Sequence, residues 1–317
     1  MATLLFHRQP RTRFPVVATL LLMVLVQVLE GAGADVATTT EAPEGRTIGE
    51  RFQALTRSAR WQKVQEVRFT FRTHHPQGLS RVGDRFFLSS VEVADRAQGR
   101  GTGHLFEVST DGHLRRQIRL GEGPMYHPGG IDYDGRWLWV PVAEYRPDSR
   151  SVVYRVDPES LAVERVFEFP DHLGALVCDR AGRRLMGVSW GSRRFYRWEW
   201  LPDQDVPRAP QTPVRTLNTS HYVDYQDGQG LPGTSWALFG GVSRLAAAGG
   251  PEVALGGLEL VDLGELRAAH QLPVPLWTRR GQSLLQNPVA VQATEAGLRF
   301  CFLPEDDESV LYVYEVR

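Results

Sequence analysis

The sequence predicts an all-β protein whose main part is a single five-bladed β-propeller with four-stranded blades. Two observations carry this prediction. The chain is rich in turn-forming residues, with 31 Gly and 20 Pro among 317 residues. It also contains five similar units, each with a short apolar strand, a turn that carries Gly and a second strand. A β-sandwich does not require five similar copies, so the repeats favour a propeller.

The five units begin at equivalent positions along the chain. Their first residues are His75, His127, His172, His221 and Asn287. Two further strand-like runs follow each of the first four units, which gives a repeat of propeller-blade length. The unit that begins at His221 is the weakest copy.

The last repeat is one strand short, because only the run 310–316 follows its first two strands. Residues 64–71 precede the first repeat and have no partner strand there. We predict that this segment becomes the outermost strand of the last blade, because a closed ring leaves no sheet edge unpaired. Residues 64–317 are therefore expected to form one propeller domain.

The first 34 residues have the pattern of a signal peptide. Basic residues precede an apolar stretch at 15–29, and Ala32, Gly33 and Ala34 form a small-x-small cleavage site. This stretch is shorter than the about 20 residues of a membrane-spanning helix, and the alternative is an uncleaved anchor. We expect a secreted or periplasmic protein that leaves the membrane after signal removal, with a linker and a short helix (47–60) over residues 35–63.

Charge and cysteine content narrow the functional classes. The 36 Lys and Arg balance 37 Asp and Glu, so there is no basic excess that would indicate a nucleic-acid partner. Cys178 and Cys301 lie in apolar runs of non-adjacent repeats and are expected to be buried thiols rather than a disulfide. Asn218 begins a glycosylation sequon, which matters only in a glycosylating host. We expect a monomer that binds a small molecule.

Two stretches carry a resemblance to a known family. The run HPGGIDYDGRWLWVPVAEYRPDSRSVVYRVDP at 127–158 and the run GVSWGSRRFYRW at 187–198 resemble a family of exported, mostly bacterial proteins that is described as a domain of unknown function. The resemblance covers about residues 65–317. It implies a propeller and no established activity. The repeats are more distantly similar to lactonase-like and quinoprotein-dehydrogenase-like propellers, which is a likeness of fold that carries no mechanism.

One mouth of the predicted ring gathers polar side chains. In a propeller blade the first strand begins, and the second strand ends, on the same face. The side chains expected around this mouth are those at the strand starts, His75, His127, His172, His221 and Asn287, and those at the strand ends, Glu92, Glu144, Trp190 and Glu305.

The four histidines of this set suggest a metal centre. Imidazoles that converge on one axis suit a divalent transition metal such as zinc, copper, iron or nickel. Glu92, Glu144 and Glu305 would then orient the imidazole rings. The alternative is that histidine is a consensus residue of the repeat, which caps each strand start.

The carboxylates allow a second hypothesis. Glu92 and Glu144 could act across the mouth as catalytic general acid and base, or as acid and nucleophile, in a hydrolase or lyase. The alternative is that they form salt bridges with Arg96, Arg146 and Arg150 in the loops that follow.

Loops on the same face carry groups suited to an anionic ligand, because guanidinium groups bind carboxylate and phosphate in a bidentate manner. The expected ligand-binding residues are Arg146, Arg150, Trp190, Arg193, Arg194, Asn287 and Glu305. The alternative is a set of solvated, charged loops.

Three functional classes therefore remain open: a binder of a small polar or anionic ligand, a carboxylate-dependent hydrolase, and a non-catalytic scaffold for a protein or polysaccharide. We favour the small-ligand site, because function concentrates in loops on a rigid frame. The four aspartates of the repeat turns are expected to serve turn geometry. These are Asp84, Asp134, Asp179 and Asp227.

Overall fold

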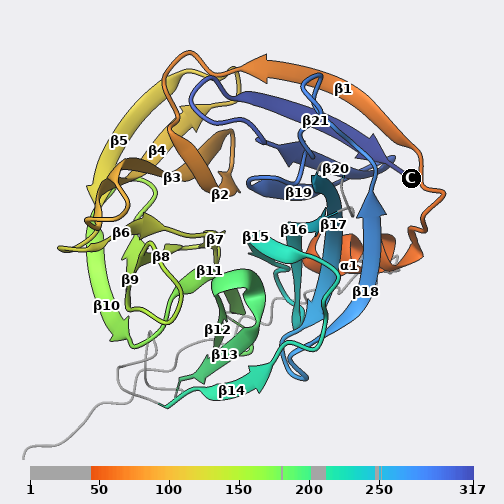
Figure 1. Ribbon diagram of the computed structural model, residues 1–317. Coiled ribbons are helices and arrows are strands. Elements are labelled where there is room, and N and C mark those ends of the chain that lie inside the picture. Colours follow the sequence, from red (N-terminus) through yellow and green to blue (C-terminus); the bar gives the residue numbers. More distant parts are fainter. Residues whose placement is uncertain (1–43, 180, 201–211, 247–249, 251) are drawn as a thin grey trace, which may run out of the picture. The chain divides into compact units, whose positions relative to one another are not determined.

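The computed structural model describes residues 44–179, 181–200, 212–246, 250 and 252–317. Within these residues it holds one α-helix, α1 (Glu44–Ala54), one 3-10 turn, η1 (Trp190–Ser192), and strands in five antiparallel sheets that follow one another around a ring (Figure 1). The predicted five-bladed propeller is confirmed. The predicted signal peptide at 1–34 lies outside the described residues. No described helix is long and apolar enough to cross a membrane.

Four of the blades consist of strands that are consecutive in the sequence. The first blade holds β2 (His75–Val82), β3 (Arg85–Asp95), β4 (Arg100–Ser109) and β5 (Leu114–Leu120). The second holds β6 (Met125–Pro128), β7 (Asp132–Tyr133), β8 (Leu138–Glu144), β9 (Ser151–Val156) and β10 (Val163–Phe169). The third holds β11 (Leu173–Asp179), β12 (Arg184–Ser189), β13 (Arg194–Glu199) and β14 (Val214–Leu217). The fourth holds β15 (Asp224–Gly230), β16 (Trp236–Ala246), β17 (Glu252–Asp262) and β18 (Arg267–Val274).

The fifth blade closes the ring by pairing segments that are far apart in the sequence. It holds β19 (Val289–Thr294), β20 (Gly297–Phe302), β21 (Val310–Val316) and, as its outermost strand, β1 (Trp61–Arg68) (Figure 1). The predicted closing strand is confirmed, but it spans Trp61–Arg68 rather than the expected 64–71. Trp61 pairs with Val316, and Val64 is the extra residue of a β-bulge.

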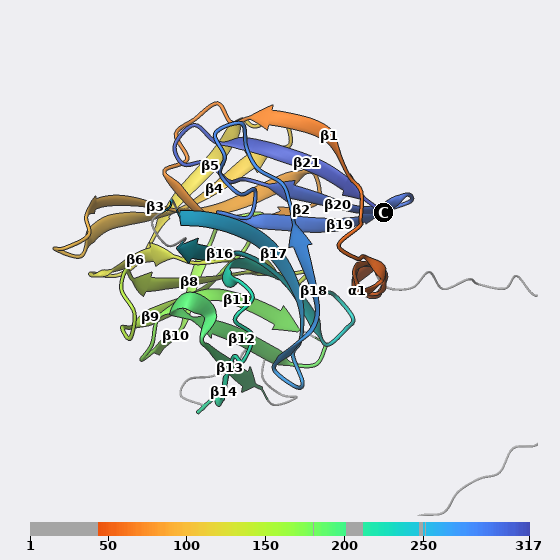
Figure 2. The ribbon, with the colours of Figure 1, turned by 45° about the vertical axis from the view of Figure 1, so that its right-hand side comes forward.

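Helix α1 lies beside the fourth and fifth blades (Figure 2). Ile48 and Phe52 are fully buried and belong to one apolar cluster with Leu258 of the fourth blade and Val289 of the fifth. The helix spans Glu44–Ala54 rather than the expected 47–60. It ends at Ala54 because the residues that follow form a turn that leads into β1.

The inner strands of the blades meet directly at the centre of the ring. Asp227 on β15 is fully buried, and its Oδ2 accepts a hydrogen bond from the amide of Leu79 at 2.8 Å. Its Oδ1 accepts another from the amide of Ile131 at 3.1 Å, so one carboxyl group joins three blades. Burial raises the pKa of Asp227 well above its ordinary value. The expectation that Asp227 serves a turn is wrong, because this residue lies within a strand.

Glycines allow this close approach of the inner strands. A Cβ atom at Gly78 would lie 2.5 Å from the amide nitrogen of Ile131, and one at Gly130 would lie 2.7 Å from Oδ1 of Asp227. The amide of Gly130 also donates to the carbonyl oxygen of Gly174 at 2.8 Å, which links the second and third blades. Side chains at these positions would force the blades apart.

The two cysteines are buried thiols, as predicted. Cys178 lies on β11 in the third blade, and Cys301 lies on β20 in the fifth.

We expect Asp227→Ala to lower the free energy of unfolding by about 2–5 kcal/mol, because two buried amides would lose their acceptor. Asp227→Asn retains one acceptor oxygen and should lose less. Urea denaturation followed by tryptophan fluorescence measures both effects. Asp84→Ala, in an exposed turn, is the control and should stay within about 0.5 kcal/mol of the wild type. An Asp227→Ala variant as stable as this control would contradict the assigned role.

Candidate functional site

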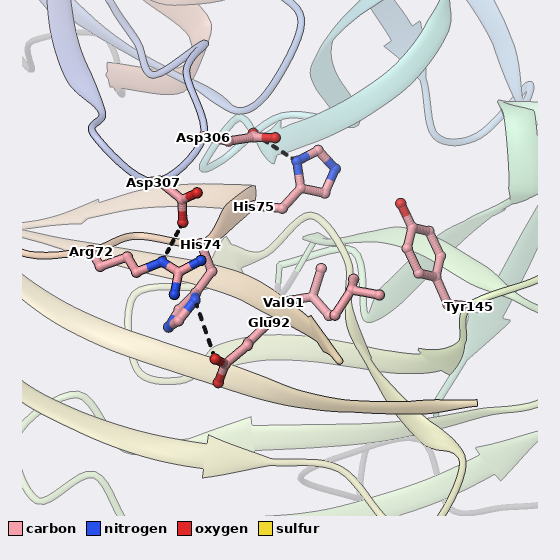
Figure 3. Close-up of a pocket in the computed structure, with 9 residues that line it drawn as sticks. Arg72, His74, His75, Val91, Glu92, Tyr145, Asp306 and Asp307 are labelled. Atoms are coloured by element: carbon pink, nitrogen blue, oxygen red, sulfur yellow. Dashed lines mark hydrogen bonds and ion pairs between the residues drawn. The ribbon is translucent and has the colours of Figure 1, made fainter. Parts of the chain in front are cut away.

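Two of the residues expected at the mouth, His75 at the start of β2 and Glu92 near the end of β3, line a pocket of about 370 Å³, which we call the mouth pocket (Figure 3). Its residues come from the first, second and fifth blades and from the segment between β1 and β2. They are Arg72, His74, His75, Val91, Glu92, Val93, Tyr145, Asp306 and Asp307.

Two contacts with carboxylates fix the rim of the mouth pocket on the side of the fifth blade. Nε of Arg72 donates to Oδ1 of Asp307 at 2.6 Å, and Nδ1 of His75 lies 2.8 Å from Oδ1 of Asp306 (Figure 3). Burial alone would raise the pKa of Asp306, but the hydrogen bond with His75 outweighs it and holds that pKa below its ordinary value. Asp306 therefore remains ionised at neutral pH.

Tyr145 lies across the pocket from Arg72 (Figure 3). Its ring stacks on His127 with 4.0 Å between the centroids, and the guanidinium of Arg96 lies 4.0 Å from the Tyr145 centroid. The ring of Trp190 lies 5.9 Å away. Cation–π and stacking contacts thus hold this side of the pocket in place.

Two of the predicted histidines are buried behind this wall. The ring centroids of His127 and His172 are 5.6 Å apart, and Nδ1 of His172 lies 2.9 Å from the carbonyl oxygen of Glu144. Burial lowers the pKa of His172 to about 4 and that of His127 well below its ordinary value, so both rings are neutral.

The other two predicted histidines lie in different surroundings. His75 lines the mouth pocket, whereas His221 is exposed and its Nδ1 lies 2.8 Å from Nη1 of Arg193. The structure therefore does not bring the four histidines into one group of metal ligands.

Glu144 is paired with Arg146 and Arg150, which was the alternative to its predicted catalytic role. Its Oε1 accepts from Nε of Arg150 at 3.0 Å, and its Oε2 lies 2.6 Å from Nη2 of Arg146. Burial would raise the pKa of Glu144, but the hydrogen bonds from the two arginines outweigh it and lower that pKa. Glu144 is thus a poor proton donor at neutral pH, and it does not line the mouth pocket with Glu92.

Two further arginines predicted to bind a ligand are occupied by carboxylates. Nη2 of Arg193 lies 3.0 Å from Asp224, and Nη1 of Arg194 lies 3.4 Å from Asp171. These side chains brace the loops of the third blade.

Asn287 and Glu305 support the fifth blade from inside. Nδ2 of Asn287, which is buried, donates to the carbonyl oxygen of Pro304 at 2.9 Å and to Oδ1 of Asp306 at 3.0 Å. Burial raises the pKa of Glu305, whose Oε1 accepts from the Tyr312 hydroxyl at 2.7 Å. Asn287 thereby positions a carboxylate of the mouth pocket.

Two sequence motifs take structural roles. Nδ2 of Asn218, the first residue of the glycosylation sequon, is buried and donates to the carbonyl oxygen of Ser192 at 2.9 Å. Residues 187–191 (GVSWG) match Gly-x-Ser-x-Gly, but Ser189 ends β12 and its Oγ accepts from the amide of Arg194 at 3.0 Å. This serine is not on the strand-to-helix elbow of α/β-hydrolases.

A cluster that the sequence did not indicate lies at one side of the mouth pocket. Among the described residues, His74, Glu92 and His104 present ligand atoms that all lie within 4.8 Å of one another. Burial and the neighbouring His74 lower the pKa of His104, which favours its neutral form. His104 lies on β4, the third strand of its blade, and the repeat pattern that predicted the mouth residues includes only first and second strands. The same pattern places His75, and not its neighbour His74, at the start of the repeat. A cross-strand pattern could have found it, because Glu92 and His104 are diagonal neighbours across β3 and β4.

A second pocket, of about 470 Å³, lies at the other end of β2 and reaches helix α1. Ser80, Asp132 and Gln229 contribute polar groups to its lining, and Ile48 of α1 contributes an apolar side chain. Burial raises the pKa of Asp132 to about 7, while its Oδ2 accepts a hydrogen bond from the amide of Cys178 at 2.8 Å.

Comparison with known proteins identifies the family. A model described as "Family of unknown function (DUF6454)" matches residues 46–317. The chain belongs to this family. The resemblance to a family of unknown function is thus confirmed, whereas the exported and mostly bacterial character of that family stays a prediction. A search of the curated proteins found no match.

Several solved structures are similar to this chain at low sequence identity. A mannose phosphorylase from Leishmania mexicana, in complex with phosphate ion, has a TM-score of 0.49 at 11% identity, over 84% of this chain and 92% of that one. The GH43 endo-arabinanase from Bacillus licheniformis has a TM-score of 0.47 at 11% identity, over 80% and 96%. The hydrazine synthase of Kuenenia stuttgartiensis has a TM-score of 0.38 at 12% identity. That match covers 74% of this chain and 57% of the hydrazine synthase chain. We draw no functional argument from these likenesses.

We expect the contribution of Asp132 to the free energy of unfolding to fall as the pH rises from 5 to 8, whereas the buried neutral His127 and His172 contribute in the opposite direction. An unfolded aspartate loses its proton near pH 4, whereas burial delays this loss to about pH 7 in the folded protein. The folded state binds more protons at Asp132 between these values, so the contribution of this group to stability decreases by at most about 1.4 kcal/mol per pH unit. Asp132→Asn should reduce this slope in urea denaturation at pH 5, 6, 7 and 8.

Asp84→Asn, which changes an exposed turn carboxylate, should leave the slope unchanged. Equal slopes for the wild type and Asp132→Asn would show that Asp132 does not retain its proton.

Proposed function

We propose that this propeller binds a small polar molecule in the mouth pocket. The observation that carries the proposal is the convergence of hydrogen-bonding groups from separate blades on one hollow of about 370 Å³. Small-molecule sites are typically about 300–1,000 Å³ and use a few polar groups in fixed positions. Arg72, Tyr145 and Asp306 meet this description from three different parts of the ring.

The charges in the pocket favour a ligand with both hydrogen-bond donors and acceptors, such as a hydroxylated or zwitterionic molecule. Arg72 and His75 are balanced by carboxylates of the fifth blade, and Glu92 adds a further negative charge. Arg146 and Arg150 are already paired with Glu144. A strongly anionic ligand would therefore have to displace existing ion pairs, which costs much of the electrostatic gain.

The fixed geometry of the wall supports binding. The Tyr145 ring is held by His127 and Arg96, so little side-chain freedom is lost when a ligand makes contact. A preorganised wall of this kind lowers the entropic cost of binding.

We expect that a thermal-shift screen of amino acids, hydroxy acids and sugars at millimolar concentration, with EDTA present, will find compounds that raise the melting temperature. Arg72→Gln should weaken binding of such a compound about tenfold or more, because a charge-assisted hydrogen bond contributes about 1.5–3 kcal/mol. Tyr145→Phe should weaken binding of hydroxylated compounds. Isothermal titration calorimetry measures the affinities.

Arg68→Gln is the matched control. Arg68 also lies near an acidic residue of the β20–β21 connection, Glu308 at 3.9 Å, but it does not line the pocket. The proposal fails if no compound binds, or if the pocket variants bind every compound as tightly as Arg68→Gln does.

A further inference from the structure

The cluster of His74, Glu92 and His104 contains buried groups that lack hydrogen-bond partners. His104 is 5% exposed, and neither of its ring nitrogens has a partner among the described residues. Nδ1 of His74 is in the same situation. A buried polar atom without a partner has lost its hydrogen bonds to water and gained none in return, so such atoms are rare in folded proteins and call for an explanation.

The separations within the cluster are longer than hydrogen bonds and also longer than the spacing of ligands around a zinc ion. Oε1 of Glu92 lies 4.0 Å from Nδ1 of His74, and its Oε2 lies 3.7 Å from Nε2 of His104. Both separations are too long for hydrogen bonds. Ligand atoms around a tetrahedral zinc ion lie about 3.3 Å apart, because each bond is about 2.0–2.1 Å long. The Glu92 side chain is 44% exposed, so it can move by the several tenths of an ångström by which both separations have to shorten.

The two imidazoles lie against each other, and one of them has to turn before both can bind the same ion. The rings of His74 and His104 stack with centroids 4.8 Å apart and planes 11° apart, so their in-plane lone pairs do not meet at one point, whereas His104 is also stacked on Phe106 at 5.3 Å and His74 is the ring at the pocket edge. His74 has a left-handed backbone with φ of 58°, which its neighbours maintain. The amide of Asp307 donates to the carbonyl oxygen of His74 at 2.7 Å, and the amide of Thr73 donates to that of Asp307 at 3.0 Å.

We propose that His74, Glu92 and His104 bind a zinc ion. Two imidazoles and one carboxylate are ligands that zinc prefers. Because His74 and Glu92 also line the mouth pocket, a fourth coordination position would face the pocket and accept water or a ligand atom. The site goes beyond the proposed function, since it needs these three side chains and no organic molecule.

The ion would also strengthen the closure of the ring. His74 belongs to the segment that runs from β1 of the fifth blade to β2 of the first, whereas Glu92 and His104 belong to β3 and β4 of the first blade. Zinc bound by all three would tie the crossing segment to the first blade. Zinc would therefore stabilise the folded protein, because it binds a site that only the folded chain assembles.

The test uses the whole protein, stripped of metal with EDTA, dialysed and titrated with zinc chloride. We expect isothermal titration calorimetry to give one zinc ion per chain, and the melting temperature to rise with zinc concentration. His104→Phe keeps an aromatic ring on Phe106 but removes both nitrogens, and Glu92→Gln removes the carboxylate. Each should lower the zinc affinity about 100-fold or more and abolish the rise in melting temperature.

His113→Phe is the matched control, because it replaces a histidine of the same blade that lies exposed outside the cluster. It should bind zinc as the wild type does. If His104→Phe does not fold, Glu92→Gln alone tests the zinc site. The Glu92 side chain is half-exposed, so its replacement should leave the fold intact. The proposal is overturned if the wild type takes up no zinc, or if Glu92→Gln retains the wild-type affinity. Because the ligand screen contains EDTA, its failure would leave the zinc result unaffected, and the reverse also holds.

Discussion

The buried carboxyl group of Asp227 is the contact on which the centre of the propeller depends. It accepts hydrogen bonds from the amides of Leu79 and Ile131, so the first and second blades share an acceptor supplied by the fourth. A water-filled channel would not need such a bridge, whereas packed inner strands leave amides that only a buried acceptor can satisfy. The same strands begin at the mouth, and their fixed spacing at the axis fixes the positions of the side chains that form the pocket.

The architecture could be predicted because it depends on a pattern that occurs five times. Each repeat places a strand start and a second strand end on the same face, so the location of the mouth followed from chain direction alone. Closure by the segment at 61–68 followed from counting strands. The bounds were less accurate because they depend on pairing with β21, and the bulge at Val64 has no signal in the sequence.

The contacts of the site could be predicted only in part, because they depend on which face of a blade meets its neighbour. The repeat pattern predicted His75 as the mouth histidine, whereas its neighbour His74 is the residue whose ring contacts His104. The left-handed backbone that directs His74 there is not encoded by the repeat. Asp227 was misassigned because its flanking glycine resembles a turn. That glycine, Gly228, instead makes room for the ring of Phe239. The salt bridges of Glu144 were foreseeable, since both arginines follow it closely in the sequence.

Ring closure has a consequence for the order in which the protein can assemble. Synthesis starts at the N-terminus, so β1 is complete long before β21, its partner, has been made. The nascent chain must carry an unpaired strand while four blades form, and contacts at such sequence separation form slowly. Five consecutive residues of β1, from Gln62 to Glu66, are exposed in the folded protein, and all but Val64 are polar. Polar side chains of this kind discourage an unpaired strand from joining a foreign sheet edge. The polar composition of β1 thus suits a strand that is synthesised first and paired last.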